Sequence, residues 1–284
     1  MSNSLITARD AFAARLPEER MDLNGRSWGV RVAGSDGPVL LLIPGTLGRG
    51  DVFWQQVEAL SNRLRIVTVS YPETGSIADW SADLQTLFDR LEIGEATVLG
   101  SSLGGYLVQY LASEAPERVT RLIAANTLHS VAGITDRPPY ALDLDTVPVA
   151  DLRAGFAKGL GAWAETHPDQ VDLVELLLGE VNGRIPEPEL RMRLKALKTA
   201  PELPPVKLPS DRIVTIEADD DPLIPPEMRS AVRDRLNPAV AYRFLSGGHF
   251  PYVARPSDYT ALLEQVMGLE VTGPDWGEEA ERSR

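Results

Sequence analysis

Hydrophobic residues in the first half of the chain form short continuous runs that alternate with helical stripes. The run Pro38–Ile43 is almost entirely apolar, as expected for a strand buried on both faces of a parallel sheet. Further strand-like runs follow at Leu64–Ser70, Ala96–Leu99 and Val119–Ala125, with helical patterns between them at Asp51–Leu60, Ser76–Leu91 and Tyr106–Leu111. This alternation predicts an α/β fold with a mostly parallel central sheet, flanking helices and right-handed crossovers.

The two ends of the chain have other patterns. Met21–Asn24 and Trp28–Ala33 are expected to be two strands, joined at Asn24-Gly25, a residue pair typical of tight hairpin turns. Residues 1–19 before them predict an N-terminal leader, either an amphipathic segment or a loose helix. Residues 271–284 are rich in Gly, Pro and charge, which predicts a disordered tail.

The alternation stops between residues 128 and 209. Three helical stripes follow one another there between prolines: Leu152, Phe156, Leu160 and Trp163; Val171, Val174, Leu178 and Val181; Leu190, Leu194 and Leu197. We predict a helical cap inserted between the sixth and seventh strands, with residues 20–127 and 210–270 forming the core. Ordinary helices covering the sheet would produce the same stripes.

Composition restricts the function more than the fold. The net charge of −13 argues against nucleic acid as a partner. The chain has no cysteine and three histidines, so we expect no disulfide, no metal site and no cofactor. Arg9, Asp10 and Arg15 interrupt the N-terminal segment, which therefore lacks the apolar core of a signal peptide, and no run approaches the roughly 20 apolar residues of a membrane span. We expect a cytoplasmic protein, and nothing in the sequence indicates its oligomeric state.

Gly100-Ser101-Ser102-Leu103-Gly104 joins a predicted strand to a predicted helix. A Gly-x-Ser-x-Gly turn in that context holds its central residue in a strained conformation, with the hydroxyl exposed above a helix N-terminus. Both glycines are required because side chains there would collide with the neighbouring strand and helix. The register therefore selects Ser102, rather than Ser101, as a candidate nucleophile.

Two later strands lead into the residues that such a serine needs. The strand Arg212–Ile216 runs into the acidic turn 219–221, and Ala241–Leu245 leads to His249. Serine, acid and histidine in this order form the triad of α/β hydrolases. In addition, the loop Pro44–Gly48 follows the first buried strand and is suited to provide an oxyanion-hole amide.

On these motifs, residues 38–269 resemble the α/β-hydrolase superfamily, and Asp51–Gln56 and Gly248–Tyr252 resemble more narrowly the maspardin group. The resemblance implies the α/β-hydrolase fold. It also implies an acid just before a proline, which selects Asp221 and leaves Asp219 and Asp220 as alternatives. Maspardins of animals are treated mainly as binding proteins and carry Asn at the position of His249, so the histidine favours catalysis here.

We therefore expect a serine hydrolase that cleaves a small, largely apolar carboxylic ester, lactone or thioester through an acyl-enzyme. Ser102 would attack, His249 would take its proton, and Asp221 would orient the imidazole. The backbone amides of Thr46 and Leu103 would form the oxyanion hole. The expected substrate pocket consists of Leu47, Phe156, Trp163 and Phe250. An acyltransferase with the same triad and a non-catalytic, maspardin-like binding protein are the alternatives.

Overall fold

The structure is a computed structural model that describes residues 3–284. Its strands are β1 (Glu19–Leu23), β2 (Arg26–Ala33), β3 (Val39–Ile43), β4 (Arg65–Ser70), β5 (Ala96–Ser101), β6 (Val119–Ala125), β7 (Ile213–Ala218), β8 (Val240–Phe244) and β9 (Glu281–Ser283). They form one nine-stranded sheet in the order β1-β2-β4-β3-β5-β6-β7-β8-β9. Among the described strands, β2 pairs antiparallel with β1 and β4, and the remaining pairs are parallel.

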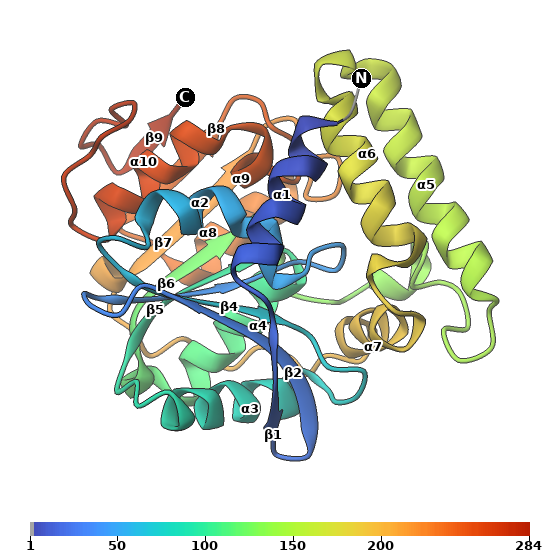
Figure 1. Cartoon of the computed structure of the whole chain (residues 1–284), viewed down its shortest axis with the longest axis horizontal. Coiled ribbons are helices and arrows are strands. Elements are labelled where there is room, and N and C mark those ends of the chain that lie inside the picture. The colour runs from blue at the N-terminus through green and yellow to red at the C-terminus, as the bar shows by residue number, and fades with distance from the viewer. Residues whose placement is uncertain (1–2) are drawn as a thin grey trace.

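Helices cover both faces of this sheet (Figure 1). They are α1 (Ser4–Arg15), α2 (Trp54–Leu60), α3 (Ile77–Arg90), α4 (Leu103–Glu114), α5 (Val149–Thr166), α6 (Val171–Gly179), α7 (Glu187–Lys198), α8 (Pro226–Leu236), α9 (Pro251–Ala254) and α10 (Pro256–Val266). Within residues 3–284 no helix is long and apolar enough to cross a membrane. The predicted three-layer α/β arrangement is confirmed.

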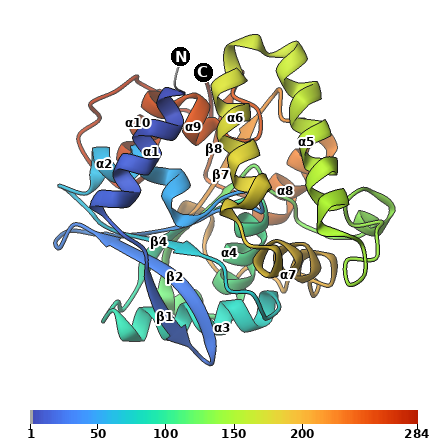
Figure 2. The same cartoon turned by 45° about the vertical axis from the view of Figure 1, so that its right-hand side comes forward.

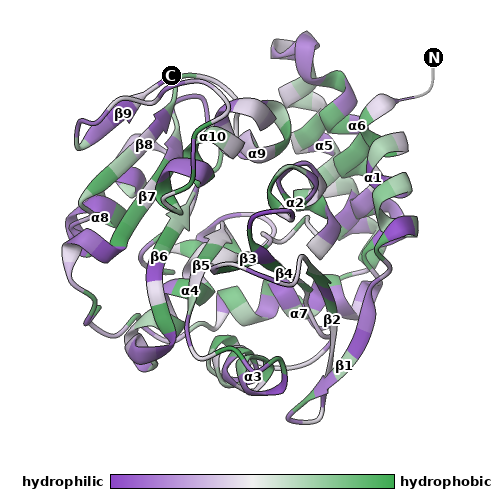
Figure 3. Ribbon diagram, turned by 60° about the vertical axis from the view of Figure 1, so that its left-hand side comes forward, coloured by the Kyte–Doolittle hydropathy of each residue, from purple (hydrophilic) through white to green (hydrophobic). Residues whose placement is uncertain are grey.

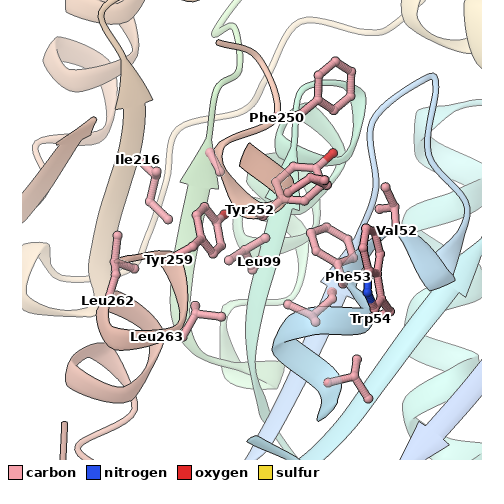
Figure 4. Close-up of a cluster of buried hydrophobic side chains, with 14 of the residues drawn as sticks. Val52, Phe53, Trp54, Leu99, Ile216, Phe250, Tyr252, Tyr259, Leu262 and Leu263 are labelled. Carbon is pink, nitrogen blue, oxygen red and sulfur yellow. The ribbon is translucent and has the colours of Figure 1, made fainter. Parts of the chain in front are cut away.

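The core lies in two layers, one on each face of the sheet, because successive strand residues point to opposite sides. Leu40 and Leu42 of β3 pack with α2 and α10, whereas Leu41 and Ile43 pack with α3 and α4. Figure 4 shows the first layer, in which aromatic side chains gather between α2 and α10. In Figure 3 the strands in the middle of the sheet are mainly hydrophobic, while β9 at one edge is hydrophilic. The apolar runs of the sequence thus correspond to the buried central strands.

Helices α5, α6 and α7 lie between β6 and β7 in the chain, where the sequence predicts three helical stripes. Figures 1 and 2 both show α5 and α6 side by side, with α1 next to α6. Leu173, Leu176 and Leu177 of α6 belong to the same buried cluster as α2 and α10. After α6 the chain makes a π-helical turn at Glu180–Arg184, which carries both charged residues toward the core. The helical segment is therefore packed on the core and not only attached to it.

The structure selects the helix alternative at the N-terminus and corrects the prediction for the C-terminus. Residues 4–15 of the expected leader form the ordered helix α1, in which Phe12 and Arg9 are buried, and β1 begins at Glu19; residues 1 and 2 lie outside the described residues. The expected disordered tail, residues 271–284, returns to the sheet as β9, which pairs with β8. Trp276 anchors this return, because its side chain is buried and its Nε1–H donates to the Asp258 carbonyl oxygen. The burial of the Trp276 indole thus explains why this segment is ordered despite its polar composition.

The predicted hairpin turn is confirmed. Asn24 and Gly25 have φ values of 53° and 80°, and Leu23 pairs directly with Arg26. Two consecutive residues with positive φ are what a type I′ turn requires, which explains why Asn-Gly occurs there.

Candidate active site

Ser102 occupies the turn between β5 and α4, with φ 54° and ψ −117°. Positive φ is strained for a residue with a side chain, and such strain persists only where the surroundings enforce it. The neighbouring glycines leave no room for side chains: a Cβ at Gly100 would stand 2.0 Å from the Gly104 carbonyl oxygen, and one at Gly104 would stand 2.4 Å from that of Ile43. The sharp strand–turn–helix geometry predicted around Ser102 is present.

Asp221 and His249 form a buried pair. His249 Nδ1 lies 2.8 Å from Asp221 Oδ2, and the two residues are 6% exposed each. Asp221 Oδ1 also accepts the N–H groups of Leu223 and Ile224, at 2.8 and 3.2 Å. Burial by itself would raise the pKa of Asp221, but the nearby His249 and the hydrogen bonds it receives lower that pKa below its usual value. The carboxylate is therefore held in its charged form against the imidazole.

The three consecutive aspartates have three different partners. Asp219 makes a two-pronged ion pair with Arg243 at 2.6 and 2.7 Å. Asp220 accepts the N–H groups of Gly247 and Gly248, at 3.0 and 2.9 Å, and so holds the loop that carries the histidine. Only Asp221 is bonded to the His249 ring. This geometry agrees with the choice of Asp221.

Ser102 and the Asp221–His249 pair lie at the same edge of the sheet. Ser102 follows β5, Asp221 follows β7 and His249 follows β8, and the carboxyl ends of parallel strands meet at one edge. Contacts from the end of β6 connect them: Thr127 Oγ1 donates to the Ser102 carbonyl oxygen at 2.7 Å, and Asn126 Nδ2 donates to Asp221 Oδ2 at 3.0 Å. The residues that the sequence singles out are thus gathered in one region.

The loop after β3 reaches the same edge. A Cβ at Gly45 would stand 3.0 Å from Ser102 Cβ, so this backbone passes directly beside the serine. Thr46 follows Gly45, and Leu103 is the first residue of α4. The first amides of a helix have no partner inside it and form the positive end of its dipole, which suits a developing negative charge. Within residues 3–284, no group of three or more acidic or histidine side chains is placed to hold a metal ion.

Comparison with known proteins agrees with this geometry. The sequence model described as the alpha/beta hydrolase fold matches residues 38–256. The chain belongs to the α/β-hydrolase family. It is similar to a maspardin of Danio rerio, with 24% identity over 89% of this chain and 83% of the relative. A pimeloyl-[acyl-carrier protein] methyl ester esterase of Nitrosomonas europaea is 25% identical over 81% of this chain and 96% of the esterase. Among solved structures, the enol-lactonase of Burkholderia xenovorans LB400 superimposes with a TM-score of 0.74 at 18% identity, covering 88% of this chain and all of that one.

The four expected pocket residues of this α/β hydrolase lie in different surroundings. The Trp163 ring packs on Gly248, next to His249. The contact is so close that a Cβ at Gly248 would stand 2.8 Å from Trp163 Cζ2. Phe250 meets the His249 ring edge-on, with 5.2 Å between the ring centroids. Leu47 is buried in the same apolar cluster as Phe250. Phe156 is partly buried between that cluster and a small one formed by Leu144, Leu152 and Leu194.

Several residues around the site escape prediction from the sequence. Asn126 bonds to Asp221, and its position just after a buried strand is the only signal that could have suggested it. If Asp220 is not the acid of the triad, the sequence predicts a solvated turn residue. In the structure its carboxylate instead accepts two backbone N–H groups of the loop that carries His249. Tyr140 lies beside Thr46: burial raises the pKa of its phenol to about 12, and the neighbouring Thr46 side chain partly offsets the rise. These partners are distant in sequence, so no local motif reveals them.

Proposed function

We propose that this α/β hydrolase is a serine hydrolase that cleaves a carboxylic ester, lactone or thioester through an acyl-enzyme on Ser102. The observation that carries the proposal is the buried Asp221–His249 hydrogen bond at the sheet edge where Ser102 occupies its strained turn. The names of two similar proteins support an ester or lactone as the substrate. One is a sequence relative named as a methyl ester esterase, and the other is a similar solved structure named as an enol-lactonase.

The proposed reaction follows from the hydrogen bonds at the site. Because His249 Nδ1 faces Asp221, a neutral ring donates there and keeps Nε2 as its acceptor. Nε2 takes the proton of Ser102 as Oγ attacks the acyl carbon, and Asp221 stabilises the imidazolium that forms. The N–H groups of Thr46 and Leu103 receive the charge on the carbonyl oxygen. The protonated imidazole then passes its proton to the leaving alcohol, and water hydrolyses the acyl-enzyme by the same route in reverse. No cofactor is needed for any of these steps.

The helical segment of residues 128–209 would act as a cap over this centre. The contact of the Trp163 ring with Gly248 supports this role, because it brings α5 against the histidine loop. Trp163 is fixed there by a hydrogen bond from its Nε1–H to Gln170 and by stacking on His167, with 3.5 Å between the ring centroids. Under this proposal, Leu47, Phe156, Trp163 and Phe250 would give the acyl pocket an apolar wall, which would favour a small apolar acyl substrate.

The proposal is tested with p-nitrophenyl esters of graded acyl length. The wild-type protein should hydrolyse the shorter esters, and Ser102→Ala and His249→Ala should each lower kcat by up to about a million-fold. Adding a primary alcohol in increasing amounts separates the two catalytic alternatives, because an acyltransferase would form the new ester in preference to the free acid. A wild-type protein that binds these esters but turns none of them over would favour the binding-protein alternative, although the intact Asp221–His249 pair argues for catalysis.

A further inference from the structure

Arg193 of α7 is completely buried and reaches across to the loop after β3. Its Nη1 donates to the carbonyl oxygens of Thr46 and Gly48, at 2.9 and 2.8 Å. Hydrogen bonds from a charged donor are shorter and stronger than those between neutral groups. One side chain of the helical segment thus holds two carbonyl groups of the loop that carries Thr46.

The guanidinium of Arg193 is itself fixed from two other directions. Its Nη2 lies 3.2 Å from Glu189 Oε2, one turn earlier in α7, and its centre lies 5.1 Å above the ring of Tyr71. Glu189 also pairs with Arg20 and Arg49, at 3.0 and 3.4 Å. A planar guanidinium with partners at its edge and on its face has little freedom to turn. Arg193 therefore behaves as a rigid support.

The loop after β3 has its peptide planes fixed by these contacts. Tyr71 donates its hydroxyl to the Pro44 carbonyl oxygen at 2.7 Å, and the Gly48 N–H donates to that of Gly45 at 3.1 Å. In a trans peptide the N–H and the C=O point in opposite directions, so the bond to the Gly45 carbonyl directs the Thr46 N–H away from the turn. Arg193 then fixes the next carbonyl, that of Thr46 itself. The direction of the Thr46 N–H, which follows the Gly45 backbone beside Ser102, is thus constrained by its neighbours on both sides.

We propose that Arg193 is a positioning residue for the oxyanion hole: it clamps the Thr46–Gly48 turn from α7 and keeps the Thr46 N–H aimed at the developing oxyanion. The proposal rests on the proposed function. An oxyanion donor is effective only when it is held in place before the reaction, and a misplacement of about 1 Å can cost a hundred-fold in rate. The helical segment would therefore contribute to the chemical step and not only enclose the substrate.

The test compares Arg193→Met, Arg193→Lys and the matched control Arg184→Met, with kcat, KM and Tm measured on p-nitrophenyl acetate. Arg184 also ties the helical segment to the core, through its ion pair with Asp51, and forms no hydrogen bond with residues 44–48. We expect Arg193→Met to lower kcat by about a hundred-fold while KM changes far less. Arg193→Lys should retain part of the activity, because an ammonium group can still reach a carbonyl oxygen. Arg184→Met should lower Tm and keep kcat.

Wild-type kcat in folded Arg193→Met would overturn the proposal, and so would equal losses of kcat in the Arg193 and Arg184 variants. If Arg193→Met does not fold, Arg193→Lys takes its place, and wild-type kcat in that variant would overturn the proposal. Tyr71→Phe is an additional variant that removes only the hydroxyl bonded to Pro44 and should lower kcat without lowering substrate affinity. Failure of the proposed function is a separate result, because the wild-type protein itself would then hydrolyse no ester.

Discussion

The loop that carries His249 and the loop that carries Thr46 are held by different parts of the chain. The histidine loop depends on residues at the ends of the core strands: Asp220 binds its amides, and Asn126 bonds to the acid that faces its imidazole. The Thr46 loop depends on Arg193, which belongs to the helical segment between β6 and β7. The comparison suggests two kinds of support in our proposal. The hydrogen bonds of the proposed acid and base come from core strand ends, whereas the proposed oxyanion loop is held both by Tyr71 of the core and by Arg193 of the helical segment.

The largest effect on the core side is expected for the acid. Asp221→Asn should lower kcat by about ten-thousand-fold, because the amide favours the wrong imidazole tautomer. Asp219→Asn is the matched control: its ion pair with the half-exposed Arg243 is at the surface, and the variant should keep its activity. Steady-state kinetics of both variants test which aspartate is the acid that orients His249. If Asp219→Asn were the inactive one, the assignment of the acid would be wrong.

A smaller loss is expected from the support beneath the histidine. Asp220→Ala removes the acceptor of two loop amides and should reduce kcat by up to about a hundred-fold. It should also lower the free energy of unfolding by about 1–3 kcal/mol. Asp220→Asn retains one carbonyl oxygen and should fall between Asp220→Ala and the wild type. Kinetics together with urea unfolding test this. Unchanged kcat in Asp220→Ala would mean that the loop keeps its conformation without the carboxylate.

The contact between α5 and the histidine loop should affect specificity more than rate. Trp163→Ala should shift kcat/KM by about tenfold toward longer acyl chains, in line with the value of one methylene in an apolar pocket. The measurement is the chain-length profile of the variant against the wild type, with Tm recorded on the same samples. A lower Tm with the same profile would make Trp163 a packing residue only.

The smallest effect concerns Glu18, which pairs with Arg49, and Arg49 in turn pairs with Glu189, the carboxylate that holds Arg193. Burial alone would raise the pKa of Glu18, but Arg49, Arg31, Arg20 and a hydrogen bond from Ser70 together lower it below its ordinary 4.5. A carboxyl with a lowered pKa contributes stability that is complete above its ordinary pKa and is lost as the pH falls through the lowered value. The unfolding free energy should therefore decrease below about pH 4.5, and less steeply in Glu18→Gln. Equal slopes for the two proteins in urea unfolding at pH 3 to 6 would contradict this.

The core side of the site can be predicted from the sequence largely because its chemistry is local. Gly100 and Gly104 have steric reasons visible in the motif, and the resemblance to the α/β-hydrolase family, which implies an acid just before a proline, selects Asp221. The same holds for the Asn24-Gly25 turn, whose positive φ angles only certain residues accept readily. Each of these signals depends on residues close together in the chain.

The support of the Thr46 loop by Arg193 and the C-terminal strand could not be predicted, for the opposite reason. Arg193 binds backbone carbonyls, and any residue type presents a carbonyl, so the Thr46 loop carries no sign of its partner. The tail returns to the sheet because one side chain, Trp276, finds a buried place near Phe244, with 4.9 Å between the ring centroids. Neither interaction produces a periodic or compositional pattern.

Covalent labelling tests the central claim, that Ser102 is an activated nucleophile, most directly. The protein is treated with a fluorophosphonate probe at neutral pH, digested, and the modified peptide is identified by mass spectrometry, with Ser101→Ala and Ser102→Ala as a matched pair. The account predicts one label on Ser102, present in the wild type and in Ser101→Ala and absent from Ser102→Ala. A label that persists in Ser102→Ala, or that maps to Ser101, would contradict it.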